Sequence, residues 1–197
     1  MPWFRRVFYA CVLASAVAFS PAIGSAATPA GRSVSAADIT IDNFGQINGA
    51  YYRGAQPNGP DYQALAALGV KTVIDLQADG IAAEERLVEE AGMRFHRIGM
   101  TTHEPPTDAQ LAEFLNLVND PENQPVYVHC AGGRHRTGVM TAVYRMAHDR
   151  WSPDQAYQEM KQFKFGADFL HPEFRRFVSS YRAEPQDRAL QAVLATN

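Results

Sequence analysis

Segment 126–138, VYVHCAGGRHRTG, constrains the fold of this 197-residue chain more than any other part of it. A run of strand-favouring residues leads into two consecutive glycines, Gly132 and Gly133, and a helical pattern starts at His135. Glycine lets the backbone curl tightly, as a short strand-to-helix connection requires. Because ligands in α/β sheets bind where strands end, the segment predicts a strand–loop–helix unit with a ligand at the loop.

Strand-like and helix-like segments alternate along most of the chain. The helix starts at Thr107 and Ser152 have capping boxes, each with glutamine three residues later, at Gln110 and Gln155. The strand candidates are residues 51–53, 70–76, 94–98 and 126–130, and the main helix candidates are residues 61–68, 82–91, 135–150 and 172–181. This alternation predicts a single α/β domain with a central, mainly parallel sheet flanked by helices.

The N-terminus has the order of features found in a secretory signal peptide. Arg5 and Arg6 precede an apolar run over residues 7–23, and small residues follow. We expect cleavage near Ala26/Ala27, a periplasmic or secreted protein, and no membrane anchor afterwards. A retained anchor is the alternative, but the apolar run is short for a membrane span.

Composition excludes several classes of protein. Hydrophobic residues make up 46% of the chain, which is enough for a core and excludes disorder as the main state. The formal net charge of −3 argues against a nucleic-acid partner. Two cysteines, Cys11 and Cys130, cannot form a disulfide framework, and cleavage would remove Cys11. No two histidines have the short spacing of zinc ligands, so we expect no metal and no other cofactor.

The predicted loop can combine a nucleophile with an anion cradle. Cys130 ends the strand, and Arg136 follows in the first helical turn. Loop N–H groups and the helix dipole would face one point and favour a tetrahedral oxyanion. A thiol beside Arg136 should ionise readily, Arg136 can hold two oxygens, and Thr137 can hydrogen-bond the sulfur. The expected phosphate-binding residues are Ala131, Gly132, Gly133, Arg134, His135, Arg136 and Thr137.

The string HCxxGxxRTG resembles the signature of cysteine-dependent tyrosine and dual-specificity phosphatases. The matching residues are His129, Cys130, Gly133, Arg136, Thr137 and Gly138. Segments YYRGAQPNGPDYQALAALGVKTVIDLQ and WSPDQAYQEM are also similar to compact bacterial phosphatases, many of them exported. The resemblance implies the Cys-x5-Arg phosphatase fold and a metal-free, two-step hydrolysis through a cysteinyl-phosphate. The expected parts are a signal peptide at 1–26, a flexible leader at 27–44, a phosphatase domain at 45–183 and a helical tail at 184–197.

The resemblance also places a general acid on a loop before the cysteine. Glu104 is our preferred candidate, although the family normally uses aspartate. Asp108 is the alternative, but it begins a capped helix, whose dipole stabilises the carboxylate form. His103 is a remote third candidate. Asp75 and Asp79 follow another strand end, where turn and capping roles are common.

The substrate is less constrained than the reaction. A phosphorylated protein, with phosphotyrosine or phosphoserine/threonine, is the main expectation. Arg134 and His135 make the loop basic, and a similar loop occurs in fungal phosphatases that act on inositol pyrophosphates, so a small polyphosphate is the alternative. Arg134 could instead face solvent or an acidic neighbour. Sulfur transfer and non-catalytic phosphate binding are less favoured alternatives.

Overall fold

The computed structural model describes residues 34–167 and 169–183. The predicted signal peptide, the first part of the leader and the tail at 184–197 lie outside the described residues. Within the part of the chain that is described, no helix combines the length and apolar character needed to cross a membrane.

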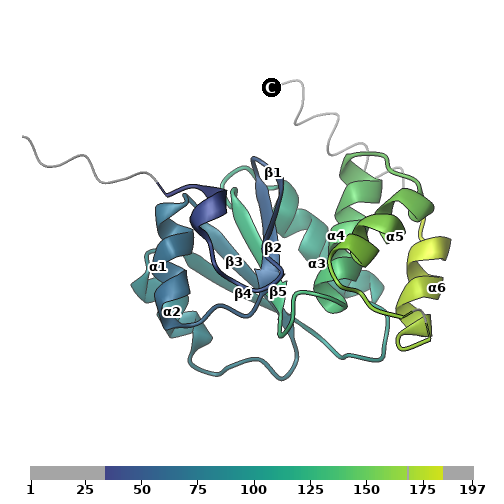
Figure 1. Cartoon of the computed structure of the whole chain (residues 1–197), viewed down its shortest axis with the longest axis horizontal. Coiled ribbons are helices and arrows are strands. Elements are labelled where there is room, and N and C mark those ends of the chain that lie inside the picture. Colours follow the sequence, from purple (N-terminus) through teal and green to yellow (C-terminus); the bar gives the residue numbers. More distant parts are fainter. Residues whose placement is uncertain (1–33, 168, 184–197) are drawn as a thin grey trace, which may run out of the picture. The chain divides into compact units, whose positions relative to one another are not determined.

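Five strands form one mixed sheet in the order β1-β2-β5-β3-β4 (Figure 1). Its members are β1 (Gly45–Asn48), β2 (Tyr51–Ala55), β3 (Thr72–Gln77), β4 (Arg94–Met100) and β5 (Val126–Cys130). The last four pair in parallel, which confirms the predicted mainly parallel sheet, and β1 pairs antiparallel with β2. Strand β1 was not predicted, because its four residues lie only partly buried at the sheet edge and show no apolar alternation.

The helices agree closely with the predicted ones. They are a 3-10 turn (Ala36–Asp38), α1 (Gly59–Ala67), α2 (Glu84–Glu90), α3 (Asp108–Asn119), α4 (Arg136–His148), α5 (Pro153–Gln162) and α6 (Pro172–Ser180). Both predicted capping boxes form, at Thr107 and at Ser152. Gly69 and Gly92 end α1 and α2 with positive φ angles of 97° and 83°, which glycine adopts without strain.

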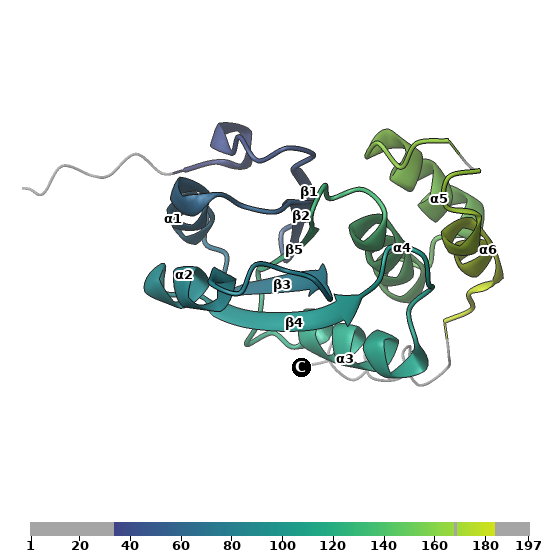
Figure 2. The same ribbon diagram turned by 90° about the horizontal axis from the view of Figure 1, so that it is seen from below.

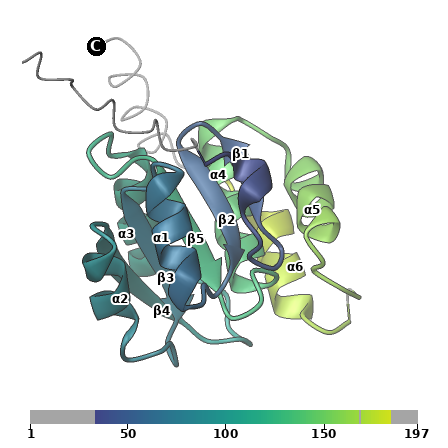
Figure 3. The ribbon, with the colours of Figure 1, turned by 60° about the vertical axis from the view of Figure 1, so that its left-hand side comes forward.

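Helices cover both faces of the sheet. Helices α1 and α2 lie on one face and α3 and α4 on the other (Figures 1 and 2). Helices α5 and α6 pack outside α4 (Figure 3). Helix α4 is therefore buried on two sides, with Met140 and Val143 toward the sheet and Val139 and Ala142 toward α5 and α6. This packing holds the first turn of α4 at the carboxyl end of β5.

The packed domain begins earlier than the predicted leader boundary at residue 44. Ile41 is buried, and the Phe44 ring stacks on Tyr52 and Tyr127 with centroid distances of 5.9 and 6.2 Å. Individual side chains make these contacts, and no repeating apolar pattern accompanies them. Periodicity therefore could not distinguish this end of the leader from a flexible one.

Candidate active site

The loop between β5 and α4 is pinned against the end of β2. Gly133 has a φ of +61°, and a Cβ there would lie 2.3 Å from the carbonyl carbon and oxygen of Gly54. Only glycine fits both the conformation and the contact. The Gly133 N–H donates to the Cys130 carbonyl at 3.4 Å, and the Gln56 N–H donates to the Ala131 carbonyl at 3.3 Å. The two predicted loop glycines thus have different surroundings, and Gly133 is the one that is sterically required.

Two side chains from distant segments hold the Gly133 carbonyl. Arg53 Nη2 donates to it at 2.6 Å and Asn43 Nδ2 at 2.8 Å. Because the C=O and N–H of a trans peptide unit point in opposite directions, this orients the Arg134 N–H away from β2. Arg53 is fully buried, 4.1 Å from the Phe163 ring centroid, and burial lowers its pKa to about 10. Neither residue was singled out from the sequence, although an arginine inside a buried strand was an available signal for Arg53.

The Cys130 thiol is 3% exposed at the end of β5. Burial by itself raises the pKa of Cys130, but four stabilising groups outweigh it: the Thr137 hydroxyl, the Thr137 N–H, the Arg136 charge and the Arg134 N–H. The net result is a lowered pKa. The Thr137 hydroxyl is buried, has no other hydrogen-bond partner among the described residues, and is near enough to the sulfur to lower the pKa of Cys130. This arrangement can present a thiolate to a bound phosphate.

Arg136 connects α4 to the end of β4. Its Nη1 donates to the Met100 carbonyl at 3.1 Å and to Asp79 Oδ1 at 3.2 Å. The hydrogen bond from Arg136 lowers the pKa of Asp79, whose side chain is otherwise mostly exposed. Asp79 lies in the turn after β3, as predicted, and its carboxylate in addition reaches Arg136 at the site. The order of strands β5, β3 and β4 produces this contact, and spacing along the chain does not reveal it.

A buried cluster of ionisable side chains includes His129, the residue before the cysteine at the end of β5. His129 Nε2 is 3.0 Å from Glu84 Oε1, and His129 Nδ1 is 3.9 Å from Asp75 Oδ1. Asp75 also accepts from Arg97 Nε at 2.8 Å and from the Gln77 N–H at 2.9 Å, the latter in the predicted turn-like manner. Burial raises the pKa of Glu84, but His129 and neighbouring donors lower it overall. Glu84 was missed because it begins a helix with the composition of a solvated surface.

The two candidate acids occupy different settings. Glu104 is exposed on the loop between β4 and α3, and Thr101 Oγ1 donates to its Oε2 at 3.2 Å. Asp108 is the first residue of α3, as predicted. Gln110 Nε2 donates to the Gly99 carbonyl at 2.7 Å, so the helix start is tied to β4 while the loop bridges between them.

The basic side chains of the loop are partly neutralised. Arg134 Nη2 lies 3.5 Å from Asp42 Oδ2, and Lys164 Nζ lies 2.6 Å from Asp42 Oδ1. The acidic neighbour considered for Arg134 is therefore present. The His135 Nε2–H donates to the Phe165 carbonyl at 3.0 Å, and burial together with nearby cations lowers the pKa of His135. The predicted extra charge on His135 thus requires a more acidic pH than for an ordinary histidine.

Comparisons with known proteins identify the family of this chain. Residues 33–174 match the family described as DSP-PTPase phosphatase fused to NAD+ kinase. The chain is 30% identical over 126 residues to the probable tyrosine-protein phosphatase DG1060 of Dictyostelium discoideum, covering 61% of this chain and 75% of that protein. It is 31% identical over 166 residues to the dual specificity protein phosphatase TpbA of Pseudomonas aeruginosa, covering 82% and 73%.

Solved structures extend the likeness to the fold. TpbA in a cysteine-to-serine form bound to phosphotyrosine superposes with a TM-score of 0.64 at 25% identity, covering 86% of this chain and all of that one. The core catalytic domain of SIW14 from Saccharomyces cerevisiae, a PP-IP phosphatase, gives 0.65 at 25% identity, covering 80% and 93%. The chain spans only 47% of the full SIW14 sequence, at 27% identity over 133 residues and 64% of this chain. The chain therefore belongs to the DSP-PTPase family and is a phosphatase of the cysteine-dependent tyrosine and dual-specificity class.

Proposed function

We propose that this phosphatase hydrolyses phosphomonoesters on proteins, phosphotyrosine first and phosphoserine/threonine second, through a cysteinyl-phosphate on Cys130. The observation that carries the proposal is the arrangement at Cys130, where the Thr137 hydroxyl, the N–H groups of Arg134 and Thr137 and the Arg136 charge act on the sulfur and lower the pKa of the thiol. The phosphotyrosine complex of TpbA supports the substrate class. Family membership disfavours sulfur transfer, and an ionisable thiol beside Arg136 disfavours a non-catalytic module.

In the first step, the Cys130 thiolate attacks phosphorus and a sulfur–phosphorus bond forms. The bond from phosphorus to the ester oxygen breaks, and its electron pair stays on that oxygen. Glu104 donates a proton to this oxygen, so that the alcohol or phenol leaves neutral. Loop N–H groups and Arg136 hold the three remaining oxygens.

In the second step, water attacks phosphorus and the sulfur–phosphorus bond breaks. The carboxylate of Glu104 takes a proton from the attacking water, and inorganic phosphate leaves. The electron pair returns to sulfur, where the Thr137 hydroxyl and the loop N–H groups stabilise the thiolate again. The cycle needs only water beyond the groups of this chain.

The charges around the loop favour a monoester over a polyphosphate. Asp42 offsets Arg134 and Lys164, and Asp79 lies against Arg136. Each acidic group reduces the local positive potential that a second phosphate would meet. A phosphotyrosine needs one oxyanion site and uncharged surroundings for its ring. These partly neutralised charges therefore favour it over a polyphosphate.

A panel of substrates tests this preference. We expect kcat/KM for a phosphotyrosine peptide to exceed that for phytate and for an inositol pyrophosphate by roughly tenfold or more, with a phosphoserine peptide between them. The Asp42→Asn variant removes the counter-charge of Arg134 and Lys164. We expect this variant to raise kcat/KM for the polyphosphates, relative to that for the phosphotyrosine peptide, by roughly threefold, which is the scale of one exposed ion pair. Initial rates of phosphate release measure both.

Faster hydrolysis of the inositol pyrophosphate than of the peptide by the unmodified protein would establish the small-molecule alternative. Glu113→Gln, an exposed acidic-to-amide change on α3, is the matched control for Asp42→Asn and is expected to leave the substrate ratio unchanged.

The Glu104→Gln variant tests the general acid. Glutamine cannot donate the proton, so kcat for a phosphotyrosine peptide is expected to fall roughly 10²-fold. The basic limb of the kcat–pH profile should flatten, because that limb reports loss of the proton from the acid. For p-nitrophenyl phosphate, kcat should fall less, because its good leaving group depends less on protonation by the acid. Rates measured between acidic and mildly alkaline pH give the profile.

Asp108→Asn and Asp79→Asn are the matched controls for this assignment. Each removes one carboxylate near the loop and keeps the side-chain size. Arg136 lowers the pKa of Asp79, so Asp79 holds a proton less readily than an unperturbed carboxyl and is a poorer proton donor. If either variant flattens the basic limb while Glu104→Gln preserves it, that residue is the acid in place of Glu104.

We also propose that the enzyme is exported and acts in the periplasm or outside the cell. The basic start, apolar run and small residues over positions 1–26 support this. A single remaining thiol, Cys130, suits an oxidising compartment because it has no partner for an internal disulfide. N-terminal sequencing of the protein recovered from its native cell would show whether residue 27 has become the first residue.

A further inference from the structure

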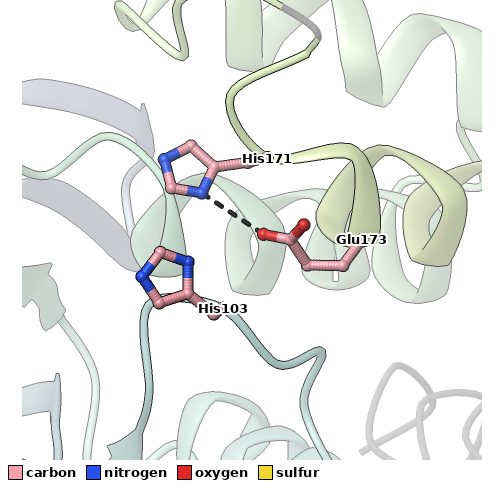
Figure 4. Close-up of side chains that lie close together, drawn as sticks. All are labelled: His103, His171 and Glu173. Atoms are coloured by element: carbon pink, nitrogen blue, oxygen red, sulfur yellow. Dashed lines mark hydrogen bonds and ion pairs between the residues drawn. The ribbon is translucent and has the colours of Figure 1, made fainter.

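Three possible metal ligands converge beside the loop between β5 and α4, which we call the phosphate loop, although not all of them are close in the sequence. His103 lies on the loop between β4 and α3, residues 101–107, which we call the acid loop. His171 is the N-cap residue of α6, and Glu173 lies in the first turn of that helix (Figure 4). Each offers one ligand atom, and these atoms all lie within 4.8 Å of one another. We propose that His103, His171 and Glu173 bind a divalent transition metal, Zn²⁺ in preference to Mg²⁺.

The donor set and spacing fit zinc. Two imidazoles and one carboxylate are typical zinc ligands, whereas Mg²⁺ prefers oxygen. Neighbouring ligands of a tetrahedral zinc lie about 3.4 Å apart, given metal–ligand bonds of about 2.0–2.1 Å. His171 Nδ1 and Glu173 Oε1 are already 3.3 Å apart. His103 must approach by roughly 1.5 Å or less and must also rotate, because its ring now stacks on that of His171 at an interplanar angle of 23°. It is exposed on a loop.

The central ligand is held in place by its surroundings. The His171 ring packs at centroid distances of 3.8 Å from His135 and 5.6 Å from Phe174, and it lies 6.1 Å from Phe165. A ligand whose ring is already oriented loses less freedom on binding a metal. Glu173 is also partly buried, which shields its carboxylate from full solvation. Two of the three ligands are therefore positioned before any metal arrives.

Metal binding would join two segments that the stacked rings of His103 and His171 already bring together, at a centroid distance of 6.1 Å. His103 and Glu104 are adjacent, so a metal on His103 ties the acid loop to the start of α6. His135 of the phosphate loop packs on the same His171 ring. A three-ligand site also leaves one coordination position for water or an anion. The site would thus restrict the motion of the loop that carries the proposed acid.

Zinc titration of the full chain tests the site. Cys130→Ser is the parent for every measurement, because the thiolate could bind zinc itself. We expect competition with a chromogenic chelator to show one Zn²⁺ per chain bound here, and His103→Ala to weaken it roughly tenfold or more. Glu173→Gln should do the same, and Mg²⁺ should not compete. His103 is exposed, so this substitution is not expected to impair folding.

His148→Ala is the matched control, because His148 is an exposed histidine beside a carboxylate, at 2.8 Å from Asp149. It should leave zinc affinity unchanged. Hydrogen exchange gives an independent readout: Zn²⁺ should slow exchange in residues 101–107 and 171–175 of the parent but not of His103→Ala. Equal zinc affinity in the parent and in His103→Ala, or loss of affinity in His148→Ala alone, would overturn the proposal.

Discussion

Replacing Cys130 with serine is expected to lower kcat for p-nitrophenyl phosphate by roughly 10⁴-fold or more while phosphopeptide binding persists. Serine keeps the size of the side chain, but its hydroxyl does not ionise under the conditions that make Cys130 a thiolate. The loop N–H groups and Arg136 remain, so the oxyanion site still binds phosphate. Steady-state rates and calorimetric titration with a phosphotyrosine peptide measure the two effects separately.

Alkylation provides the control for this variant. Iodoacetate should inactivate the unmodified enzyme, and inorganic phosphate should protect it. Because the pKa of Cys130 is lowered, the alkylation rate should reach its plateau at a pH below that of an ordinary cysteine, whose pKa is about 8.5. Retained activity in Cys130→Ser, or a thiol insensitive to both reagents, would refute the cysteinyl-phosphate mechanism.

Replacing Arg136 with lysine is expected to lower kcat/KM roughly 10²- to 10³-fold although the charge is conserved. Lysine cannot hold two phosphoryl oxygens with a planar fork. It would also lose the hydrogen bond from Nη1 to the Met100 carbonyl, which ties α4 to the start of the acid loop. We expect kcat to fall and KM to rise, and initial rates with a phosphotyrosine peptide measure both.

Arg134→Lys is the matched control for this substitution. Arg134 is two residues away on the same loop, but its side chain is exposed and lies beside Asp42. Its contribution to the loop comes from the backbone N–H, which the substitution keeps. We expect less than about a threefold change in kcat/KM. A loss of less than about threefold in Arg136→Lys as well would mean that general charge, rather than the Arg136 fork, binds the phosphate.

The fold was predictable to the extent that it depends on neighbouring residues. Strand β5 matches its predicted bounds, and α3 and α5 begin at the predicted capping boxes. These features arise from apolar runs and side-chain bonds three residues apart, which the sequence displays directly. Strand β1 and the packing of Phe44 were missed, because an edge strand and one aromatic contact carry no periodic signal.

The candidate site likewise has a part that neighbouring residues specify and a part that distant segments contribute. The positions of Cys130 at a strand end and Arg136 in the first helical turn follow from one continuous segment. The groups that act on that segment come from elsewhere: Arg53 on the Gly133 carbonyl, and Asp79 on Arg136. Asp42 changes the charge balance that the sequence of the loop suggests.

The strand–glycine loop–helix unit, its thiol and its arginine could be read from the chain, because glycine conformation, helix capping and strand burial act between near neighbours. The groups that surround that unit come from distant segments, and the folded arrangement of those segments places them there. Strand order brings Asp79 and Met100 to Arg136, and the packing of α6 beside the acid loop brings His171 and Glu173 to His103. These contacts depend on which distant segments meet at one edge of the sheet, and no pattern of neighbouring residues specifies such a meeting.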